Sequence, residues 1–221
     1  MIEEILPPPV SAVDTTDDPA DAVLLPAEEA LISRAVASRR REFTTVRHCA
    51  RLALARLGLP PAALLPGERG APQWPDGVVG SMTHCAGYRA AAVAPATAVR
   101  TIGIDAEPHQ PLPGSVLRVI SLPAERDALT ALAAGHPGVC WDRLLFCAKE
   151  SVYKAWFPLT RQWLGFQQAE ISIKDYGIFE ARLLVPGPSL TGFTGRWLVR
   201  DGLVLTAIAE PCAAYAGNYI M

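Results

Sequence analysis

The chain has 221 residues, of which 50% are hydrophobic and 19% charged, and its formal net charge is −2. This apolar content is sufficient for a sizeable core and excludes a disordered tail. The nearly neutral charge excludes a global attraction to nucleic acid, and no apolar stretch approaches the roughly 20 residues that span a bilayer. We therefore expect a soluble, folded protein of one large domain or two lobes.

The opening segment is acidic, with eight Asp or Glu and no Lys or Arg before Arg34. Because it also contains three consecutive prolines at 7–9, we expect it to pack late or loosely. It lacks the basic start and apolar run of a secretory signal, and the five cysteines form no Cys-x-x-Cys pair. These features predict a cytoplasmic protein with reduced, mostly buried thiols.

A cationic segment follows, with seven Arg and a single acid, Glu42, between Arg34 and Arg56. Apolar residues recur at steps of three and four from Val46 to Leu57, which predicts a helix that ends at Gly58. Arg47 and Arg51 would share one face of this helix. That face can be an ordinary solvated surface or a binding surface for a small polyanion, and the residues alone leave both interpretations open.

The segment from Pro61 to Pro75 is rich in Gly and Pro, which predicts a loop. Residues 78–84 then predict a strand that runs into a turn at His84, and residues 90–94 predict a buried strand. A single His is more often a structural hydrogen-bonding residue than a site residue. A nucleophilic pair of His84 and Cys85 is disfavoured, because adjacent residues of a strand point to opposite faces.

Residues 101–108 predict a strand that carries two carboxylates. Asp105 and Glu107 are two positions apart, so an extended chain presents both on one face. Two such negative charges repel unless a cation lies between them, and Mg²⁺ with carboxylate and phosphate oxygens is the usual solution. The alternative is a solvated end of a strand, at which Pro108 stops the pairing.

Residues 144–158 predict a helix closed by Pro158, with Glu150 and Lys154 four positions apart. This pair can be an exposed ion pair. However, the chain has seventeen Arg and three Lys, and this segment contains two of the Lys, Lys149 and Lys154. That choice favours a requirement for a compact ammonium charge. Later strands are expected near residues 170–174, 179–185, 195–199 and 203–209, with a hairpin turn at Asp201-Gly202.

These features together indicate chemistry on a phosphate group. Neither a Gly-x-x-x-x-Gly-Lys loop nor a Gly-x-Gly-x-x-Gly turn occurs in the sequence, so the two common ways of holding a nucleotide are excluded. What remains is the binding of a pyrophosphate by a metal ion and basic side chains.

Five motifs carry a resemblance to a known family. They are Arg39–Arg47 (RRREFTTVR), Gly70–Pro75 (GAPQWP), Ser81–Cys85 (SMTHC), Gly103–Glu107 (GIDAE) and Lys149–Ala155 (KESVYKA). In this order the chain resembles the 4′-phosphopantetheinyl transferases from about Arg34 to Phe166, and most closely the bacterial surfactin- and enterobactin-type enzymes, including actinobacterial members.

The resemblance implies that coenzyme A is cleaved at its pyrophosphate. The phosphopantetheine arm would pass to a serine of an apo acyl or peptidyl carrier protein, with Mg²⁺ or Mn²⁺ as the metal and adenosine 3′,5′-bisphosphate as the second product. The implied metal ligands are Asp105, Glu107 and Glu150. Glu150 would also be the base for the carrier serine, either directly or through a metal-bound water, and Lys154 would bind the pyrophosphate and stabilise the leaving oxygen.

The resemblance also assigns the binding of the coenzyme A phosphates. The implied residues are Arg39, Arg47, Arg69, Ser81 and His84. One departure is Pro66, which stands where some relatives have a second loop lysine, and it puts a contact of this loop with the adenine or the 3′-phosphate in doubt.

The implied fold is α/β of the α+β kind, with two similar lobes related by pseudo-two-fold symmetry. Each lobe would have a small antiparallel sheet and a long helix, and we expect the lobes to span residues 1–103 and 104–221. The implied molecule is a monomer, with a basic or apolar surface for its acidic carrier protein near Ser115–Val119.

Two other classes of function remain open. A metal-dependent phosphohydrolase or nuclease would use the same carboxylates without a protein acceptor. A non-catalytic binder of coenzyme A or a nucleotide would need only the arginine helix, that is, the helix predicted in the cationic segment between Arg34 and Arg56. The sequence also leaves open whether the carrier serves fatty-acid, polyketide, nonribosomal peptide or siderophore synthesis.

Overall fold

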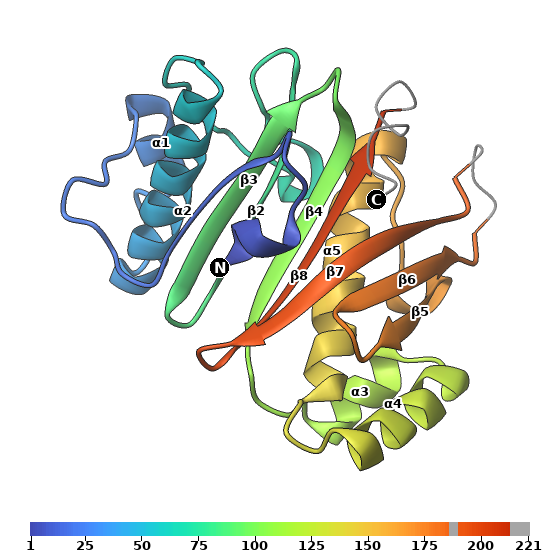
Figure 1. Ribbon diagram of the computed structural model, residues 1–221. Coiled ribbons are helices and arrows are strands. Elements are labelled where there is room, and N and C mark those ends of the chain that lie inside the picture. The colour runs from blue at the N-terminus through green and yellow to red at the C-terminus, as the bar shows by residue number, and fades with distance from the viewer. Residues whose placement is uncertain (186–189, 213–221) are drawn as a thin grey trace.

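The computed structural model describes residues 1–185 and 190–212. Two antiparallel sheets each pack against one long helix (Figure 1). The first sheet has the order β1-β3-β2 and packs against α2 (Ala37–Arg56); its strands are β1 (Ser11–Thr15), β2 (Val78–Cys85) and β3 (Tyr88–Pro95). This lobe confirms the predicted helix that ends before Gly58 and the predicted buried strand at residues 90–94.

The second sheet has the order β4-β8-β7-β6-β5 and packs against α5 (Trp141–Thr160). Its strands are β4 (Val99–Pro108), β5 (Ala169–Lys174), β6 (Ile178–Leu183), β7 (Gly192–Arg200) and β8 (Leu203–Pro211). The shorter helices are η1 (Ile2–Ile5), α1 (Pro26–Leu31), η2 (Glu68–Gly70), α3 (Gly114–Ile120), α4 (Pro123–Gly135) and η3 (Phe166–Gln168). The expected α+β architecture of two lobes, each with a sheet and a long helix, is confirmed, although the sheets differ in strand number.

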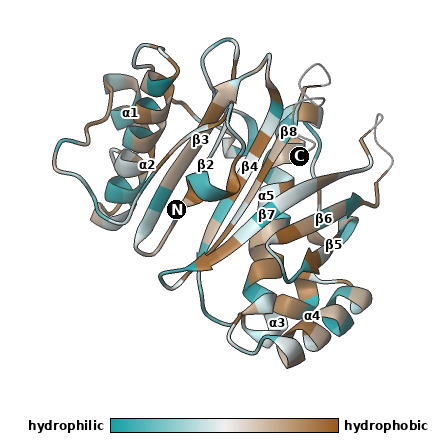
Figure 2. Ribbon diagram, in the orientation of Figure 1, coloured by the Kyte–Doolittle hydropathy of each residue, from teal (hydrophilic) through white to brown (hydrophobic). Residues whose placement is uncertain are grey.

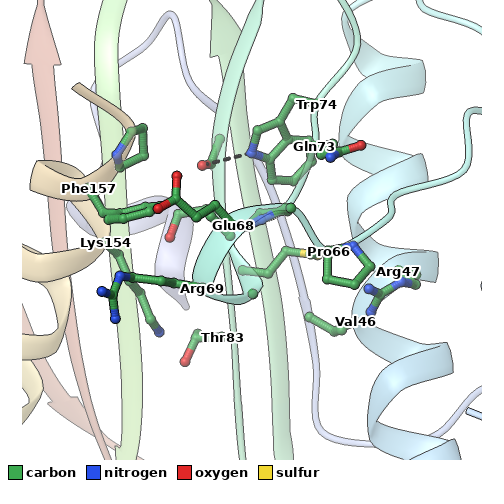
Figure 3. Close-up of a pocket in the computed structure, with 18 of the residues that line it drawn as sticks. Val46, Arg47, Pro66, Glu68, Arg69, Gln73, Trp74, Thr83, Lys154 and Phe157 are labelled. Atoms are coloured by element: carbon green, nitrogen blue, oxygen red, sulfur yellow. Dashed lines mark hydrogen bonds between the residues drawn. The ribbon is translucent and has the colours of Figure 1, made fainter. Parts of the chain in front are cut away.

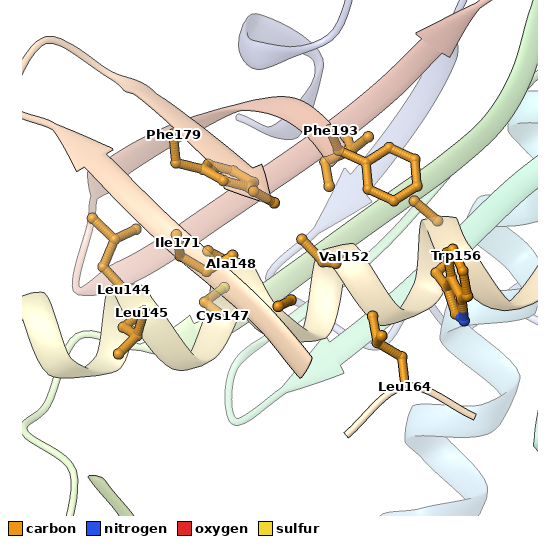
Figure 4. Close-up of a cluster of buried hydrophobic side chains, with 14 of the residues drawn as sticks. Leu144, Leu145, Cys147, Ala148, Val152, Trp156, Leu164, Ile171, Phe179 and Phe193 are labelled. Carbon is orange, nitrogen blue, oxygen red and sulfur yellow. The ribbon is translucent and has the colours of Figure 1, made fainter. Parts of the chain in front are cut away.

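Hydrophobic packing holds each sheet to its helix. Against the second sheet, α5 buries a continuous cluster that includes Val152, Trp156 and Phe179 (Figure 4). Against the first sheet, α2 buries a smaller cluster that includes Leu54. The central strands are hydrophobic over long stretches, as the colouring of β4 shows (Figure 2). No helix in the described part of the chain is both long and apolar enough to cross a membrane.

The two sheets meet where β2 lies beside β4. Two side-chain hydroxyl groups of β2 accept hydrogen bonds from backbone N–H groups of β4. Ser81 Oγ accepts from Ile104 N, and Thr83 Oγ1 accepts from Ala106 N, both at 3.1 Å. Ser81 and Thr83 are two positions apart and therefore share one face of β2. These bonds fix the register between the two lobes.

The boundary expected between residues 103 and 104 lies inside β4, which pairs with β8 as one continuous strand of the second sheet up to Pro108. We propose a boundary between β3 and β4, at residues 96–98. The hairpin turn at Asp201-Gly202 is confirmed, because both residues have positive φ (51° and 74°), as a type I′ turn requires.

Two expectations for particular segments are wrong. Pro158 does not close its helix: α5 continues to Thr160 and ends at Arg161, which has a left-handed φ of 57°. Proline fixes a φ that is compatible with a helix, and at this position it costs only one hydrogen bond near the helix end. The acidic opening is not loosely packed, because Ile2 is fully buried and β1 pairs with β3 along its whole length.

The expectation for the cysteines is confirmed in part. All five are free thiols, but only Cys49 and Cys147 are buried, and the other three are half-buried.

Candidate active site

A cavity of about 1000 Å³ lies between α2, the loop at residues 66–74, β2 and α5. Arg47 from α2 and Lys154 from α5 approach it from opposite sides, and Arg69 extends from the loop on the side of Lys154 (Figure 3). Its lining contains seven of the predicted site residues, namely Arg39, Arg47, Arg69, Ser81, His84, Glu150 and Lys154. Asp105 and Glu107 do not line it; they lie on the adjacent strand β4. Pro66 also lines it, so the loop presents no ammonium group at that position.

Arg47 is held in a defined position in the wall of this cavity. Its guanidinium lies over the ring of Phe43, with Cζ 3.2 Å from the ring centroid, and its Nε donates to Leu64 O at 3.0 Å. Burial lowers the pKa of Arg47 to about 10, so the side chain stays cationic at neutral pH. This arrangement presents a fixed positive charge to an anionic ligand.

The buried carboxylate of Glu28 organises the base of the arginine helix. It accepts hydrogen bonds from Arg51 Nη1 and from the backbone N of Leu25 and Leu64, each at 2.9 Å, and lies 3.8 Å from Arg47 Nε. Arg51 is therefore a structural residue, whereas Arg47 reaches the cavity. Arg47 and Arg51, which were predicted to share one face of this helix, therefore have different roles.

His84 lies at the end of β2, within the strand and not after it. Its Nε2 is hydrogen-bonded to Arg39, and Glu42 lies 3.5 Å from the same nitrogen. Burial and then the charge of Arg39 lower the pKa of His84, which favours the neutral imidazole. Arg39 and His84 thus form a second basic position in the lining, with Glu42 as their counter-charge.

Asp105 is the centre of the polar network behind the cavity. Its Oδ1 accepts hydrogen bonds from Lys154 Nζ at 2.7 Å and from Thr83 Oγ1 at 3.1 Å. Its Oδ2 is buried and has no hydrogen-bond partner among the described residues. Lys154 also donates to Ile104 O at 3.0 Å; although burial opposes it, the Asp105 carboxylate raises the pKa of Lys154. This ammonium group therefore remains charged.

The other two carboxylates lie near Asp105. Glu107 bonds to Arg143 at 2.9 Å, and Glu150 makes no hydrogen bond to any residue that the structure describes. Burial and then the charge of Asp105 raise the pKa of both Glu107 and Glu150. Since Arg143 and Lys154 both reach β4 from α5, Asp105 and Glu107 share one face of the strand, as predicted.

These groups fit a divalent cation by their chemistry. Over residues 1–185 and 190–212, no three His, Cys, Asp or Glu side chains are gathered into a ready-made metal cluster. However, Asp105 Oδ2 and the Glu150 carboxylate have no hydrogen-bond partner among the described residues, and carboxylate oxygens are the ligands that Mg²⁺ takes. An unpartnered buried carboxylate oxygen is costly unless a ligand binds it.

Sequence reasoning missed several residues around the site. Thr83 holds Asp105, and only its spacing of two from Ser81 could have indicated that role. Tyr153 lines the cavity with a buried hydroxyl that has no partner among the described residues, and its ring lies 5.1 Å from that of Trp163. Arg69 lies over Trp163 at 5.3 Å, so the first-lobe loop contacts the second lobe.

Lys149 belongs to the protein interior and not to the cavity between the lobes. It forms a buried ion pair with Glu125 at 2.9 Å and donates to the carbonyl groups of Phe166 and Ala169. Of the two lysines in this motif, therefore, only Lys154 lines the cavity that contains the candidate phosphate-binding residues.

Comparison with known proteins assigns the chain to a family. Residues 27–94 match the family model of the 4′-phosphopantetheinyl transferase N-terminal domain, and residues 101–208 match that of the 4′-phosphopantetheinyl transferase superfamily. The chain belongs to this superfamily. It is an enzyme that moves the phosphopantetheine arm of coenzyme A to a serine of a carrier protein, and the resemblance of the five motifs is confirmed.

Three actinobacterial relatives cover nearly the whole chain. The 4′-phosphopantetheinyl transferase Svp of Streptomyces mobaraensis is 60% identical, over 93% of this chain and 85% of the relative. The transferase Npt of Nocardia iowensis is 55% identical, over 95% and 99%. The transferase PptT of Mycobacterium tuberculosis (strain ATCC 25618 / H37Rv) is 53% identical, over 94% and 97%.

Proposed function

We propose that this phosphopantetheinyl transferase is Mg²⁺-dependent and releases adenosine 3′,5′-bisphosphate. Asp105, Glu107 and Glu150 would hold the metal, which supplies charge neutralisation and orientation for the pyrophosphate when it is bound. The observation that carries this proposal is the buried Oδ2 of Asp105, which has no partner in the described chain and lies behind a large cavity with basic walls. Mn²⁺ has the same preference for oxygen ligands and is an expected substitute.

The basic side chains of the cavity would bind coenzyme A through its phosphates. Arg39, Arg47, Arg69 and His84 surround the cavity from three elements of the first lobe, and Ser81 offers a hydroxyl group there. The positioned guanidinium of Arg47 matches phosphate oxygens with little loss of side-chain freedom. On the opposite wall, the Lys154 ammonium would stabilise the negative charge that develops on the leaving oxygen.

Glu150 is the residue best suited to accept the proton of the carrier serine. Its carboxylate lines the cavity and has no hydrogen-bond partner in the described part of the chain. As a metal ligand it would act on the serine directly or through a metal-bound water, and this role depends on hydrogen-bond reach to the serine more than on a shifted pKa. The serine oxygen would then attack the phosphorus, while Lys154 holds the departing side.

An apo acyl or peptidyl carrier protein is the proposed acceptor. The helix α3, which contacts α5 and η3, offers a docking position, because Val119 is exposed and Arg118 lies beside it in the sequence. Carrier proteins are typically acidic, so a basic and apolar patch would be complementary to them. We propose that the enzyme acts in the cytoplasm as a monomer, and its five free thiols are in keeping with a reducing compartment.

Intact-protein mass spectrometry tests the reaction directly. A purified apo carrier protein is incubated with this enzyme, coenzyme A and Mg²⁺, with EDTA and a carrier whose serine is replaced by alanine as controls. We expect one phosphopantetheine to be added in the complete reaction and none in either control, with adenosine 3′,5′-bisphosphate formed in equal amount. Transfer that persists in EDTA would overturn the metal requirement, and binding of coenzyme A without transfer to any carrier class would favour the non-catalytic alternative.

A further inference from the structure

Arg143, in the first turn of α5, makes hydrogen bonds to the end of β4 and to the residues that follow it. Arg143 Nη1 donates to Glu107 Oε2 at 2.9 Å, and its Nε donates to Gln110 O at 2.9 Å. Its Nη2 reaches Pro111 O at 3.4 Å. Only 17% of the side chain is exposed. The planar guanidinium thus uses three of its nitrogen atoms on three acceptors, which is a far more defined arrangement than a solvated surface ion pair.

Arg143 belongs to the same face of α5 as the candidate catalytic residues. Glu150 and Lys154 follow it by seven and eleven positions, a spacing that brings side chains to one side of a helix. From this face, Lys154 bonds to Asp105 and Arg143 bonds to Glu107. The helix therefore supplies one cation to each carboxylate of β4.

In both ion pairs the cation bonds to one oxygen of the carboxylate, and the second oxygen has no part in the pair. Asp105 is engaged through Oδ1 and Glu107 through Oε2. Within the described residues, neither Asp105 Oδ2 nor Glu107 Oε1 has a hydrogen-bond partner. A carboxylate bound in this way cannot rotate freely, so the direction of its remaining oxygen is determined by the cation that holds it.

We propose that Arg143 is a positioning residue of this enzyme, which orients Glu107 so that its free oxygen joins those of Asp105 and Glu150 toward a divalent cation. This inference rests on the proposed role of Glu107 as a metal ligand. Arg143 itself touches neither the metal nor the substrate. The contacts with Gln110 O and Pro111 O fix the guanidinium on the backbone, which a lysine with a single ammonium group could not reproduce.

Binding of Mn²⁺, followed by electron paramagnetic resonance with saturating coenzyme A, tests the proposal. We expect R143A and R143Q to lower the Mn²⁺ affinity by about tenfold to a hundredfold, the usual effect of losing a residue that orients a metal ligand. R143K should recover part of this loss, because it retains the charge. The affinity for coenzyme A in EDTA, measured by calorimetry, should change by less than about twofold, since Arg143 is outside the phosphate-binding cavity. Unchanged Mn²⁺ affinity in folded R143A and R143Q would overturn the proposal.

Two control variants separate orientation of Glu107 from support of the loop. Asp142 Oδ2 accepts a hydrogen bond from Leu112 N at 2.7 Å and thus holds the same loop. Its Oδ1 accepts one from the backbone N of Arg143 at 2.8 Å, but Asp142 bonds neither to Glu107 nor to the Arg143 guanidinium. We expect D142A to retain the Mn²⁺ affinity, and a loss equal to that of R143A would refute the orienting role. The variant R182A removes another Arg–Glu pair, with Glu170, at a distant part of the sheet and should have no effect.

The variant E107Q tests the metal ligand Glu107 separately from the orienting role of Arg143. If E107Q leaves the Mn²⁺ affinity unchanged, Glu107 is not a metal ligand and the metal assignment under the proposed function fails. If E107Q weakens the binding but R143A and R143Q do not, the metal assignment stands and the role of Arg143 is refuted. Weakening by both sets of variants supports both statements.

Discussion

At Gly103 the backbones of β4 and α5 approach each other closely. A Cβ atom at this position would lie 2.8 Å from Ala155 N and 3.0 Å from Ala155 Cβ, and still nearer to the carbonyl oxygen of Ser151. Non-bonded carbon atoms rest about 3.5–4.0 Å apart, so in Gly103→Ala the helix would have to retreat by roughly 1 Å. Because two of these atoms are backbone atoms, no side-chain rotation can relieve the clash.

The expected losses of stability and activity in Gly103→Ala follow from the side chains that α5 holds in place. Because β4 belongs to the sheet on which α5 packs, a retreat of the helix also loosens the hydrophobic cluster that α5 buries there. Overpacking of a core usually costs about 1–3 kcal/mol, and we expect a reduction of about 3 kcal/mol in the free energy of unfolding. The same shift stretches the 2.7 Å bond between Asp105 and Lys154. A displacement of about 1 Å at catalytic groups can lower the rate by about a hundredfold, so we expect activity to fall together with stability.

Urea unfolding followed by circular dichroism measures the stability, and mass spectrometry of the carrier protein measures the rate at a temperature at which the variant remains folded. Gly138→Ala is the matched control, because Gly138 has no positive φ and nothing lies within 4 Å of its Cβ position. The control should change the unfolding free energy by less than about 0.5 kcal/mol and retain full activity. If Gly103→Ala behaves like Gly138→Ala in both assays, the close approach of β4 and α5 does not position the site.

Three further predictions concern single side chains. Glu28→Gln removes the counter-charge of Arg51 and Arg47 from a fully buried position and should destabilise the protein by about 3–5 kcal/mol in urea unfolding, whereas Glu29→Gln on the exposed side of the same helix should have little effect. Arg47→Ala should weaken the binding of coenzyme A by about tenfold or more in titration calorimetry, the loss expected for a charge-assisted contact, and an unchanged affinity would contradict its role. Asp105→Ala and Glu150→Ala should each abolish transfer to the carrier protein while circular dichroism remains native, so a folded variant with full activity would refute its assignment.

The sequence was most informative where function depends on residues close together in the chain. Asp105 and Glu107 share a face because they are two apart in a strand, and Glu150 and Lys154 share one because they are four apart in a helix. The type I′ hairpin at Asp201-Gly202 was predictable for the same reason. Such periodicities are properties of the backbone, and they do not depend on what packs against each element.

Predictions were less successful where a segment depends on distant parts of the chain. The acidic opening has a composition typical of a loose segment, but Glu28 is buried and Ile2 lies in the core. The charges of this segment meet partners that lie outside it in the sequence, as Glu28 does with Arg51 and Asp18 with Arg89. Composition describes the charges of a segment but not their partners.

The sequence by itself determined the order and type of most elements, the family and the set of candidate ligands, because these depend on local spacing and on motifs. Only the tertiary structure decided the pairing of cations and carboxylates: Lys154 with Asp105, Arg143 with Glu107, and Arg51 with Glu28. It also separated Arg47 from Arg51 and Lys154 from Lys149, although each pair shares a residue type and a segment. The physical reason is that these contacts join residues at least 23 positions apart, so they exist only once each helix has packed against the rest of its own lobe.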